Sequence, residues 1–285
     1  MIKKLAILLI LTTIICGCGG VSEDEGKKTI YVTITPLQAI VEEVTGGDYK
    51  VETLVPKGAS PESFEPTAKQ LMALNDAEQI FSVGLINFEQ SLISSVKQSN
   101  RIVNLSKGVE LLAGSCSHCG HHHSHGIDPH IWTSPRALKR MVENIGETMC
   151  KIAPDSVKYQ VNTDKLLCKL NTLDSLCNSK IYANGVDAIM IYHPAFTYYA
   201  HDYGIEQIAV EQDGKEPSPR QLTTLVEKAR NHNITTILIQ PQYGKDKLRA
   251  LATECGAEIV EVDPLCEDIV AEIERVTNII CSRNE

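Results

Sequence analysis

Basic residues are scarce in this chain relative to acidic ones, and the shortage excludes one large class of function. The 285 residues include 27 Lys+Arg against 36 Asp+Glu, a net charge of −9 with neutral histidines. Because Lys and Arg drive binding to a phosphate backbone, this balance argues against a nucleic-acid partner and suits a cation ligand. The 43% apolar and 22% charged fractions are typical of a folded globular protein and exclude wholesale disorder.

Several common catalytic motifs are also missing. The sequence has no Walker Gly-rich loop, no Gly-x-Ser-x-Gly elbow and no His-Glu-x-x-His pair. What it has instead is histidine and cysteine. There are nine histidines, five of them within residues 118–125, and ten cysteines.

A single strongly apolar run stands at the beginning of the chain. Two lysines precede an apolar stretch over residues 5–15, which is too short for a comfortable transmembrane span and is typical of an export signal. The small residue Gly17 directly precedes Cys18, as in a bacterial lipobox. We therefore expect a lipoprotein signal peptide over 1–17, lipid on Cys18 and a polar tether over 18–28. The alternative is a plain secreted protein with incidental cysteines.

The rest of the chain alternates short β-rich runs with helical patterns. Strands are predicted at 29–34, 49–55, 79–83, 101–105, 187–192, 207–210, 235–239 and 258–262. Residues 135–182 are almost wholly helical in pattern, with one break at Pro154. This order predicts an α/β protein with two parallel-sheet lobes, over 29–133 and 183–285, joined by a long rigid helix within 134–182.

Export also sets the expectation for the cysteines, because disulfides form outside the cytoplasm. Eight cysteines lie beyond Cys18, which is too many for the sequence to choose their pairing. Cys255, Cys266 and Cys281 all fall near the end of the chain, so we expect one local C-terminal disulfide among them.

Metal-capable side chains stand at loop positions in both predicted lobes. Parallel sheets present ligands beyond the carboxyl ends of their strands, and three candidates follow strands there. Imidazole and carboxylate together suit Zn²⁺, Mn²⁺ or Fe²⁺. Each residue alone has an ordinary alternative, such as helix capping or a solvated loop position. Their joint placement predicts one ion in a cleft between the lobes, held by Glu62, His130, His193 and Asp263.

Five motifs, in order, resemble those of one known family. They are Gly58-Ala59-Ser60-Pro61 with Phe64-Glu65-Pro66, Asp128-Pro129-His130-Ile131-Trp132, His193-Pro194-Ala195-Phe196, Glu216-Pro217-Ser218-Pro219 and Asp263-Pro264-Leu265. From about Thr29 to the C-terminus the chain is similar to the zinc- and manganese-binding solute receptors of ABC importers, the ZnuA-like proteins of zinc uptake. The resemblance implies a cluster A-I receptor with two four-stranded lobes, a rigid connecting helix and a buried metal at the four positions named above.

The resemblance also implies partners and location. Such a receptor captures its metal outside the cytoplasm and delivers it to a membrane permease, and a separate subunit uses ATP, in keeping with the missing Walker loop. We expect a monomer that is no enzyme, anchored through Cys18 on the periplasmic side or at the cell surface.

Glu62 departs from the family pattern. The zinc members usually have His at this position, whereas the manganese members usually have Glu where this chain has His193. Three outcomes are open: Glu62 ligates through oxygen, a residue of the His-rich loop or a water takes its place, or the site binds weakly. We favour Glu62 as a ligand because carboxylate oxygens are ordinary zinc ligands.

A His-rich loop precedes His130 and forms a second signal. Its soft and borderline donors lack a fixed geometry, so we expect an accessory site of modest affinity. The alternative is a solvated loop with its two cysteines in a disulfide. The position of the loop matches that of zinc receptors in the family, which favours zinc over manganese. Its donors are Cys116, His118, Cys119, His121, His122, His123 and His125.

Other residues and functions remain as weaker alternatives. We assign Glu211 to a structural turn, Tyr198 and Tyr199 to packing, and His201 to the surface. The alternative functions are a Mn²⁺ or Fe²⁺ receptor, a metal-dependent adhesin, and a zinc hydrolase with Glu62 as general base.

Overall fold

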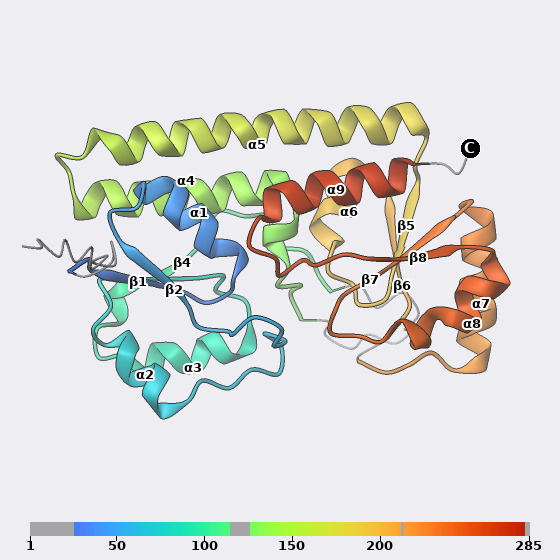
Figure 1. Cartoon of the computed structure of the whole chain (residues 1–285), viewed down its shortest axis with the longest axis horizontal. Helices are drawn as coiled ribbons and strands as arrows, with labels where there is room; N and C mark the ends of the chain where they lie inside the picture. Colours follow the sequence, from blue (N-terminus) through green and yellow to red (C-terminus); the bar gives the residue numbers. More distant parts are fainter. Residues whose placement is uncertain (1–25, 115–125, 212–213, 283–285) are drawn as a thin grey trace, which may run out of the picture.

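The computed structural model describes residues 26–114, 126–211 and 214–282. Over these residues the chain forms two α/β lobes that lie side by side along a pair of long helices (Figure 1). The expected signal peptide, the expected lipidation site Cys18 and the His-rich tract 116–125 lie outside the described residues.

The N-terminal lobe is built on a four-stranded parallel sheet. The strand order is β2-β1-β3-β4, so the chain reverses its direction of winding between β1 and β3. The elements are β1 (Thr29–Val32), α1 (Pro36–Thr45), β2 (Lys50–Thr53), α2 (Ala68–Leu74), β3 (Gln79–Ser82), α3 (Asn87–Ser95), η1 (Ser99–Arg101) and β4 (Ile102–Asn104).

The C-terminal lobe repeats this topology. Its order β6-β5-β7-β8 is again parallel, and the winding reverses between β5 and β7. The predicted fold class is therefore confirmed, and all eight strands lie within two residues of their predicted limits. The elements are β5 (Ala188–Ile191), α6 (Thr197–Tyr203), β6 (Glu206–Ala209), α7 (Pro219–Asn231), β7 (Thr236–Ile239), η3 (Lys245–Leu248), α8 (Arg249–Cys255), β8 (Glu258–Glu261) and α9 (Ile269–Cys281).

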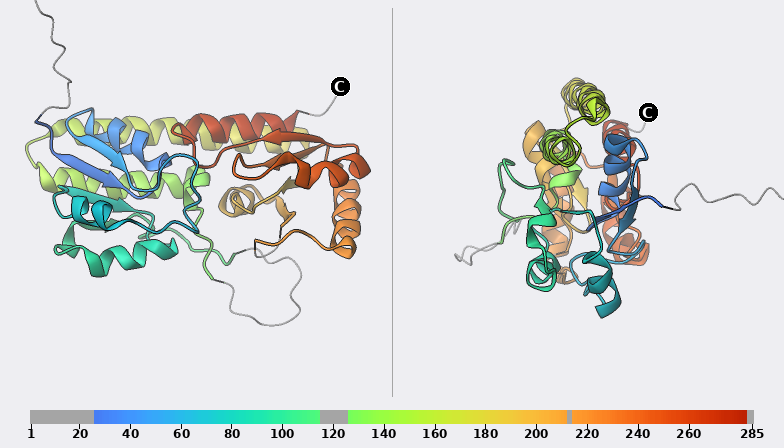
Figure 2. Two further views of the ribbon diagram at one scale, coloured as in Figure 1. Left: turned by 60° about the horizontal axis from the view of Figure 1, so that its bottom comes forward. Right: turned by 90° about the vertical axis from the view of Figure 1, so that its left-hand side faces the viewer.

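A helical hairpin connects the lobes. After η2 (Ile131–Thr133) come α4 (Pro135–Ile152) and α5 (Val157–Asn184), and the turn between them contains Pro154, which lacks the N–H that a continuous helix needs. The 28 residues of α5 rise about 42 Å, enough to run along both lobes (Figure 1, Figure 2). Neither α5 nor any other described helix combines the length and apolar character required to cross a bilayer.

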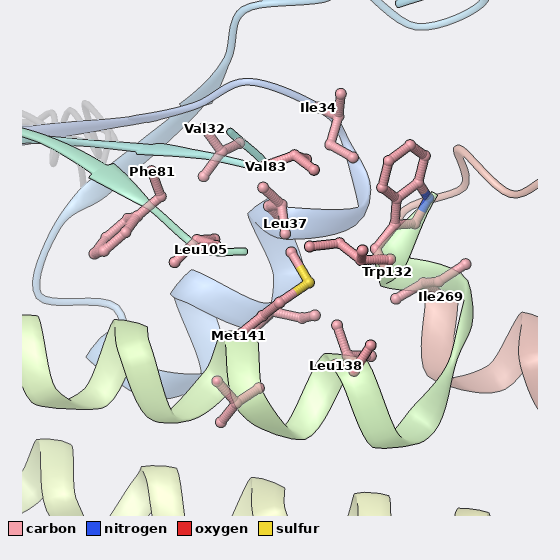
Figure 3. Packing of buried hydrophobic residues seen from close by; sticks show 14 of the residues in the cluster. Val32, Ile34, Leu37, Phe81, Val83, Leu105, Trp132, Leu138, Met141 and Ile269 are labelled. Atoms are coloured by element: carbon pink, nitrogen blue, oxygen red, sulfur yellow. The ribbon is translucent and has the colours of Figure 1, made fainter. Parts of the chain in front are cut away.

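One hydrophobic core passes from the N-terminal lobe through the helical hairpin into the C-terminal lobe. It includes strand residues of β1 and β3, the buried faces of α4 and α5, and the buried face of α9. Trp132 lies at the junction, 2% exposed, beside Ile34 of the first lobe and Ile269 of α9 (Figure 3). Its indole N–H donates to the carbonyl oxygen of Pro264 at 2.8 Å. A second cluster fills the other side of the C-terminal sheet.

The expected C-terminal disulfide is wrong, because Cys255, Cys266 and Cys281 are free thiols. They lie on different parts of the lobe. Cys255 ends α8 and packs against the second cluster, whereas the other two pack against the main core. Cys266 lies before the 13-residue helix α9, which is about 20 Å long, whereas Cys281 is its last residue.

Replacing the junction tryptophan tests the shared core. We expect Trp132→Ala to lower the free energy of unfolding by about 3–5 kcal/mol, because it leaves a cavity between the lobes and removes the hydrogen bond to Pro264. Urea unfolding of the metal-free protein, followed by far-UV circular dichroism, measures the change. Tyr182→Ala is the matched control, since that ring is 88% exposed. Equal stability of the two variants would contradict a core shared at Trp132.

Candidate metal centre

Three side chains from distant parts of the chain converge in the cleft between the lobes. Glu62 Oε1 lies 2.7 Å from His193 Nε2 and 3.4 Å from His130 Nε2. The two Nε2 atoms are 3.4 Å apart. All three atoms lie within 4.8 Å of one another, so one cation can contact them together.

The topology of the sheets explains this convergence. Glu62 lies on the loop between β2 and α2, and His193 is the second residue after the end of β5. Gln240, which follows β7 on the other side of the reversal point, is 3% exposed and holds the backbone of His193. Its Oε1 accepts from the His193 N–H at 3.2 Å, and its Nε2 donates to the His193 carbonyl at 2.7 Å. The site therefore occupies the crevice where ligands of such sheets bind.

A buried carboxylate stands behind each imidazole. Asp128 Oδ1 lies 2.9 Å from His130 Nδ1, and Glu211 Oε1 lies 2.5 Å from His193 Nδ1. The two carboxylates belong to residues 3% and 5% exposed. When such a carboxylate accepts the Nδ1 proton, the other ring nitrogen keeps its lone pair for a metal, and the ring is held in place.

Sequence reasoning did not find these two supporting carboxylates. It assigned Glu211 to a turn, yet Glu211 follows β6, and β6 pairs with β5, which carries His193. That neighbour relation depends on the strand order, which only the structure supplies. Asp128 stands two residues before His130 within a recognised motif, and this short spacing was the available signal.

The charges in the site shift the pKa of each ligand. Burial alone would lower the pKa of His193, but its hydrogen bonds to Glu211 and Glu62 outweigh burial and raise it to about 9. The pKa of His130 is also raised, because Asp128 and Glu62 overcome its burial. Burial would raise the pKa of Glu62, but both imidazoles hold it well below its usual range. The carboxylates around the two imidazoles thus favour positive charge at this point, which a metal cation could supply in place of protons.

Asp263 follows β8 but lies outside the three-residue cluster. Its Oδ1 accepts from the Leu265 N–H at 3.0 Å, and its own N–H donates to Glu272 at 2.7 Å. Burial raises the pKa of the Asp263 carboxyl. The same loop contributes Pro264 and Leu265 to the wall of the site. The structure thus brings together three of the four predicted ligands and places the fourth on an adjoining loop.

The cavity at the three ligands is small and largely apolar. Its volume is about 40 Å³, which leaves room for an ion and a water or two. The Tyr243 ring stacks on His193 with centroids 6.0 Å apart and planes 29° apart. The two imidazoles are 10% and 16% exposed, whereas the Glu62 side chain is 41% exposed. The site therefore suits a bare ion rather than an organic substrate, and Glu62 is its most accessible ligand.

The remaining candidates lie away from the cluster. The side chains of Tyr198 and Tyr199 are buried in the core, and that of His201 is 55% exposed. The predictions of packing for the tyrosines and of a surface position for His201 are confirmed. The chain on either side of the His-rich tract pairs as a short ladder, in which Gly114 N–H donates to the Gly126 carbonyl at 2.9 Å. That ladder ends at Asp128, behind His130.

Known proteins share both the sequence and the fold. The high-affinity zinc uptake system protein ZnuA of Bacillus subtilis is 28% identical over 279 residues, covering 90% of this chain and 88% of that protein. The zinc-binding lipoprotein AdcA of Streptococcus pneumoniae is 26% identical over 283 residues, and the chain spans 55% of its length. A solved crystal structure of ZnuA matches with a TM-score of 0.80 at 29% identity, covering 90% of this chain and 98% of that one.

The family model described as zinc-uptake complex component A, periplasmic, matches residues 30–273, which is most of the chain. It confirms the resemblance carried by the five motifs. It also confirms the predicted class of protein, a metal-binding solute receptor rather than an enzyme. The chain therefore belongs to the family of the periplasmic component A of zinc-uptake complexes.

Proposed function

We propose that the protein is an extracytoplasmic receptor that binds Zn²⁺ tightly and delivers it to the permease of an ABC importer. The convergence of Glu62, His130 and His193 on one point carries this proposal. Two imidazole nitrogens and a carboxylate oxygen, each imidazole backed by a carboxylate, form a donor set that suits zinc. The zinc-binding and zinc-uptake relatives support the same metal.

The remaining predicted donors have separate roles in this proposal. Asp263 is the fourth ligand, because it stands at the carboxyl end of β8 on a loop that already lines the cavity. The His-rich tract 116–125 gathers zinc at lower affinity ahead of the cleft. Its flanking ladder runs directly into Asp128, which supports a path from the tract to His130.

Transfer to the permease requires a site that both holds and releases its ion. The imidazoles take up protons when the metal leaves, since the carboxylates around them raise their pKa. Glu62, the most exposed of the three ligands, supplies the side from which the ion is exchanged. ATP hydrolysis belongs to a separate subunit of the importer.

The alternative functions have less support. Manganese-bound and adhesin structures share the fold, but at 18–22% identity they carry no argument about the cargo or partner of this chain. A zinc hydrolase would need space for a substrate beside the metal, and the cavity is only about 40 Å³.

We further propose a lipid anchor on Cys18. The small Gly17 before it and the apolar run upstream support lipidation. We expect Cys18→Ala, expressed in a bacterial host that processes lipoproteins, to move the protein from the membrane to the soluble fraction. Cys16→Ala is the control and should stay in the membrane fraction. An unchanged distribution of Cys18→Ala would refute the anchor.

Removing one imidazole tests the assigned site. We expect the chelator-treated protein to take up about one tightly bound zinc ion. His193→Ala should raise the zinc dissociation constant more than about 100-fold, which exceeds the usual effect of removing a residue that only hydrogen-bonds to a ligand. Calorimetric titration with zinc measures both. His201→Ala is the control, because that histidine is exposed and lies on α6 away from the cluster. Wild-type affinity in His193→Ala would refute the assignment.

The raised pKa values predict how zinc binding depends on pH. Zinc must displace the proton that His193 holds up to a pKa of about 9, so affinity should fall as the pH falls from 9 towards 6. The expected change is about tenfold per pH unit for each displaced proton. Competition with a chromophoric chelator measures affinity across this range. Calorimetry in two buffers of different ionisation enthalpy counts the released protons, and pH-independent affinity would contradict the charge balance described here.

Exchanging Glu62 for the residue usual in zinc receptors tests its part in selectivity. We expect Glu62→His to raise the ratio of the Mn²⁺ to the Zn²⁺ dissociation constant by about tenfold, because imidazole suits zinc whereas manganese prefers oxygen. Calorimetric titrations with each ion give the ratio. Glu65→His, an exposed position on the same loop, controls for the added histidine. An unchanged ratio would show that Glu62 does not contact the ion.

A further inference from the structure

His130 precedes the connecting helices in sequence, but Asp128, the carboxylate behind it, is held by side chains of the C-terminal lobe. Asp128, which accepts from the backbone N–H of His130 at 2.8 Å and lies 2.9 Å from its Nδ1, also accepts from Thr197. Thr197 Oγ1 donates to Asp128 Oδ2 at 2.6 Å. Tyr198, the next residue of α6, donates from its hydroxyl to the Asp128 carbonyl at 2.8 Å.

The hydroxyl of Thr197 is itself directed by Gln207 of β6. Gln207 Nε2 donates to Thr197 Oγ1 at 2.9 Å. The orientation of this amide is fixed, because Gln207 Oε1 accepts from the Phe196 N–H at 2.6 Å. A hydroxyl has a single proton, and Gln207 already donates to its oxygen. That proton is therefore directed to Asp128.

The outcome is a chain of hydrogen bonds with only one consistent direction. Gln207 donates to Thr197, Thr197 donates to Asp128, and Asp128 is left as an acceptor for the Nδ1–H of His130. With Nδ1 protonated, the metal-binding atom of His130 is Nε2, which faces Glu62 and His193.

We infer that Thr197 and Gln207 are positioning residues of the metal site, which fix the tautomer and orientation of His130 from the C-terminal lobe. This inference rests on the proposed metal-binding function. Both imidazoles then depend on one lobe, because His193 follows β5 and its partner Glu211 follows β6. Glu62, by contrast, lies on the loop between β2 and α2 of the N-terminal lobe.

Two substitutions break the chain of hydrogen bonds in different ways. Thr197→Val keeps the shape of the side chain and removes the hydroxyl. Gln207→Glu keeps an acceptor for Phe196 but removes the donor to Thr197, so the threonine proton is drawn away from Asp128. We expect either change to weaken zinc binding about tenfold, the lower end of the effect of outer-sphere partners. Chelator competition measures the dissociation constants.

Two controls and a spectroscopic readout separate positioning from a structural role. Thr197→Ser retains the hydroxyl, and Thr223→Val makes the same substitution at an exposed position of α7; both should bind zinc as the wild type does. In the zinc-loaded protein, nitrogen-15 NMR should show a His130 Nδ1–H that exchanges with water faster in Thr197→Val and Gln207→Glu than in Thr197→Ser.

The outcomes distinguish this inference from the proposed function. If the wild type does not bind zinc, the proposed function fails. If the wild type binds zinc and both Thr197→Val and Gln207→Glu retain its affinity and its Nδ1–H protection, the positioning role alone is overturned. If Thr197→Val does not fold, the comparison of Gln207→Glu with Thr197→Ser still tests the positioning role, because both variants keep a hydroxyl at position 197.

Discussion

The Nε2 atoms of two imidazoles, largely removed from solvent, face each other at 3.4 Å and would repel if both rings were charged with no carboxylate near them. Asp128 and Glu211 resolve this conflict, since each accepts a hydrogen bond from the far side of one ring. A buried carboxylate is costly unless it is paired. Each carboxylate therefore favours the conformation in which it stays hydrogen-bonded to its imidazole. The orientation of both imidazoles in the candidate metal centre depends on these two contacts.

The fold supplies the rigid frame that such contacts need. In each lobe the reversal of winding leaves a crevice at the carboxyl ends of the central strands, and the hydrophobic core that joins the lobes brings the two crevices together. Gln240 anchors the backbone of His193, while Trp132 ties the segment after His130 to the loop after β8. Precise placement of Glu62, His130 and His193 therefore rests on contacts and packing some distance from the point where they converge.

The strands of the fold and three residues of the candidate site could be predicted from the sequence. The alternation of β-rich runs and helical spacing located all eight strands, because both faces of a parallel sheet are buried and leave a strong apolar signal. Glu62 and His193 were found because they follow strands, and strand ends gather at one edge of a sheet. His130 follows no strand and was found as a loop histidine directly before the long helical region. Glu211 was missed because its position beside His193 depends on which strands are neighbours. The predicted disulfide among the C-terminal cysteines was wrong because closeness in sequence does not fix closeness in space. Cys255 ends α8, and α9 lies between Cys266 and Cys281 in the chain.

The position of Trp132 has an optical consequence. It is the one tryptophan of the chain, and its ring centroid lies 5.2 Å from that of His130. Indole emission depends on the charge and mobility of its immediate surroundings, so the tryptophan fluorescence of this protein originates beside its candidate metal centre. Selective excitation of this indole would therefore follow the charge of the cleft with no label needed.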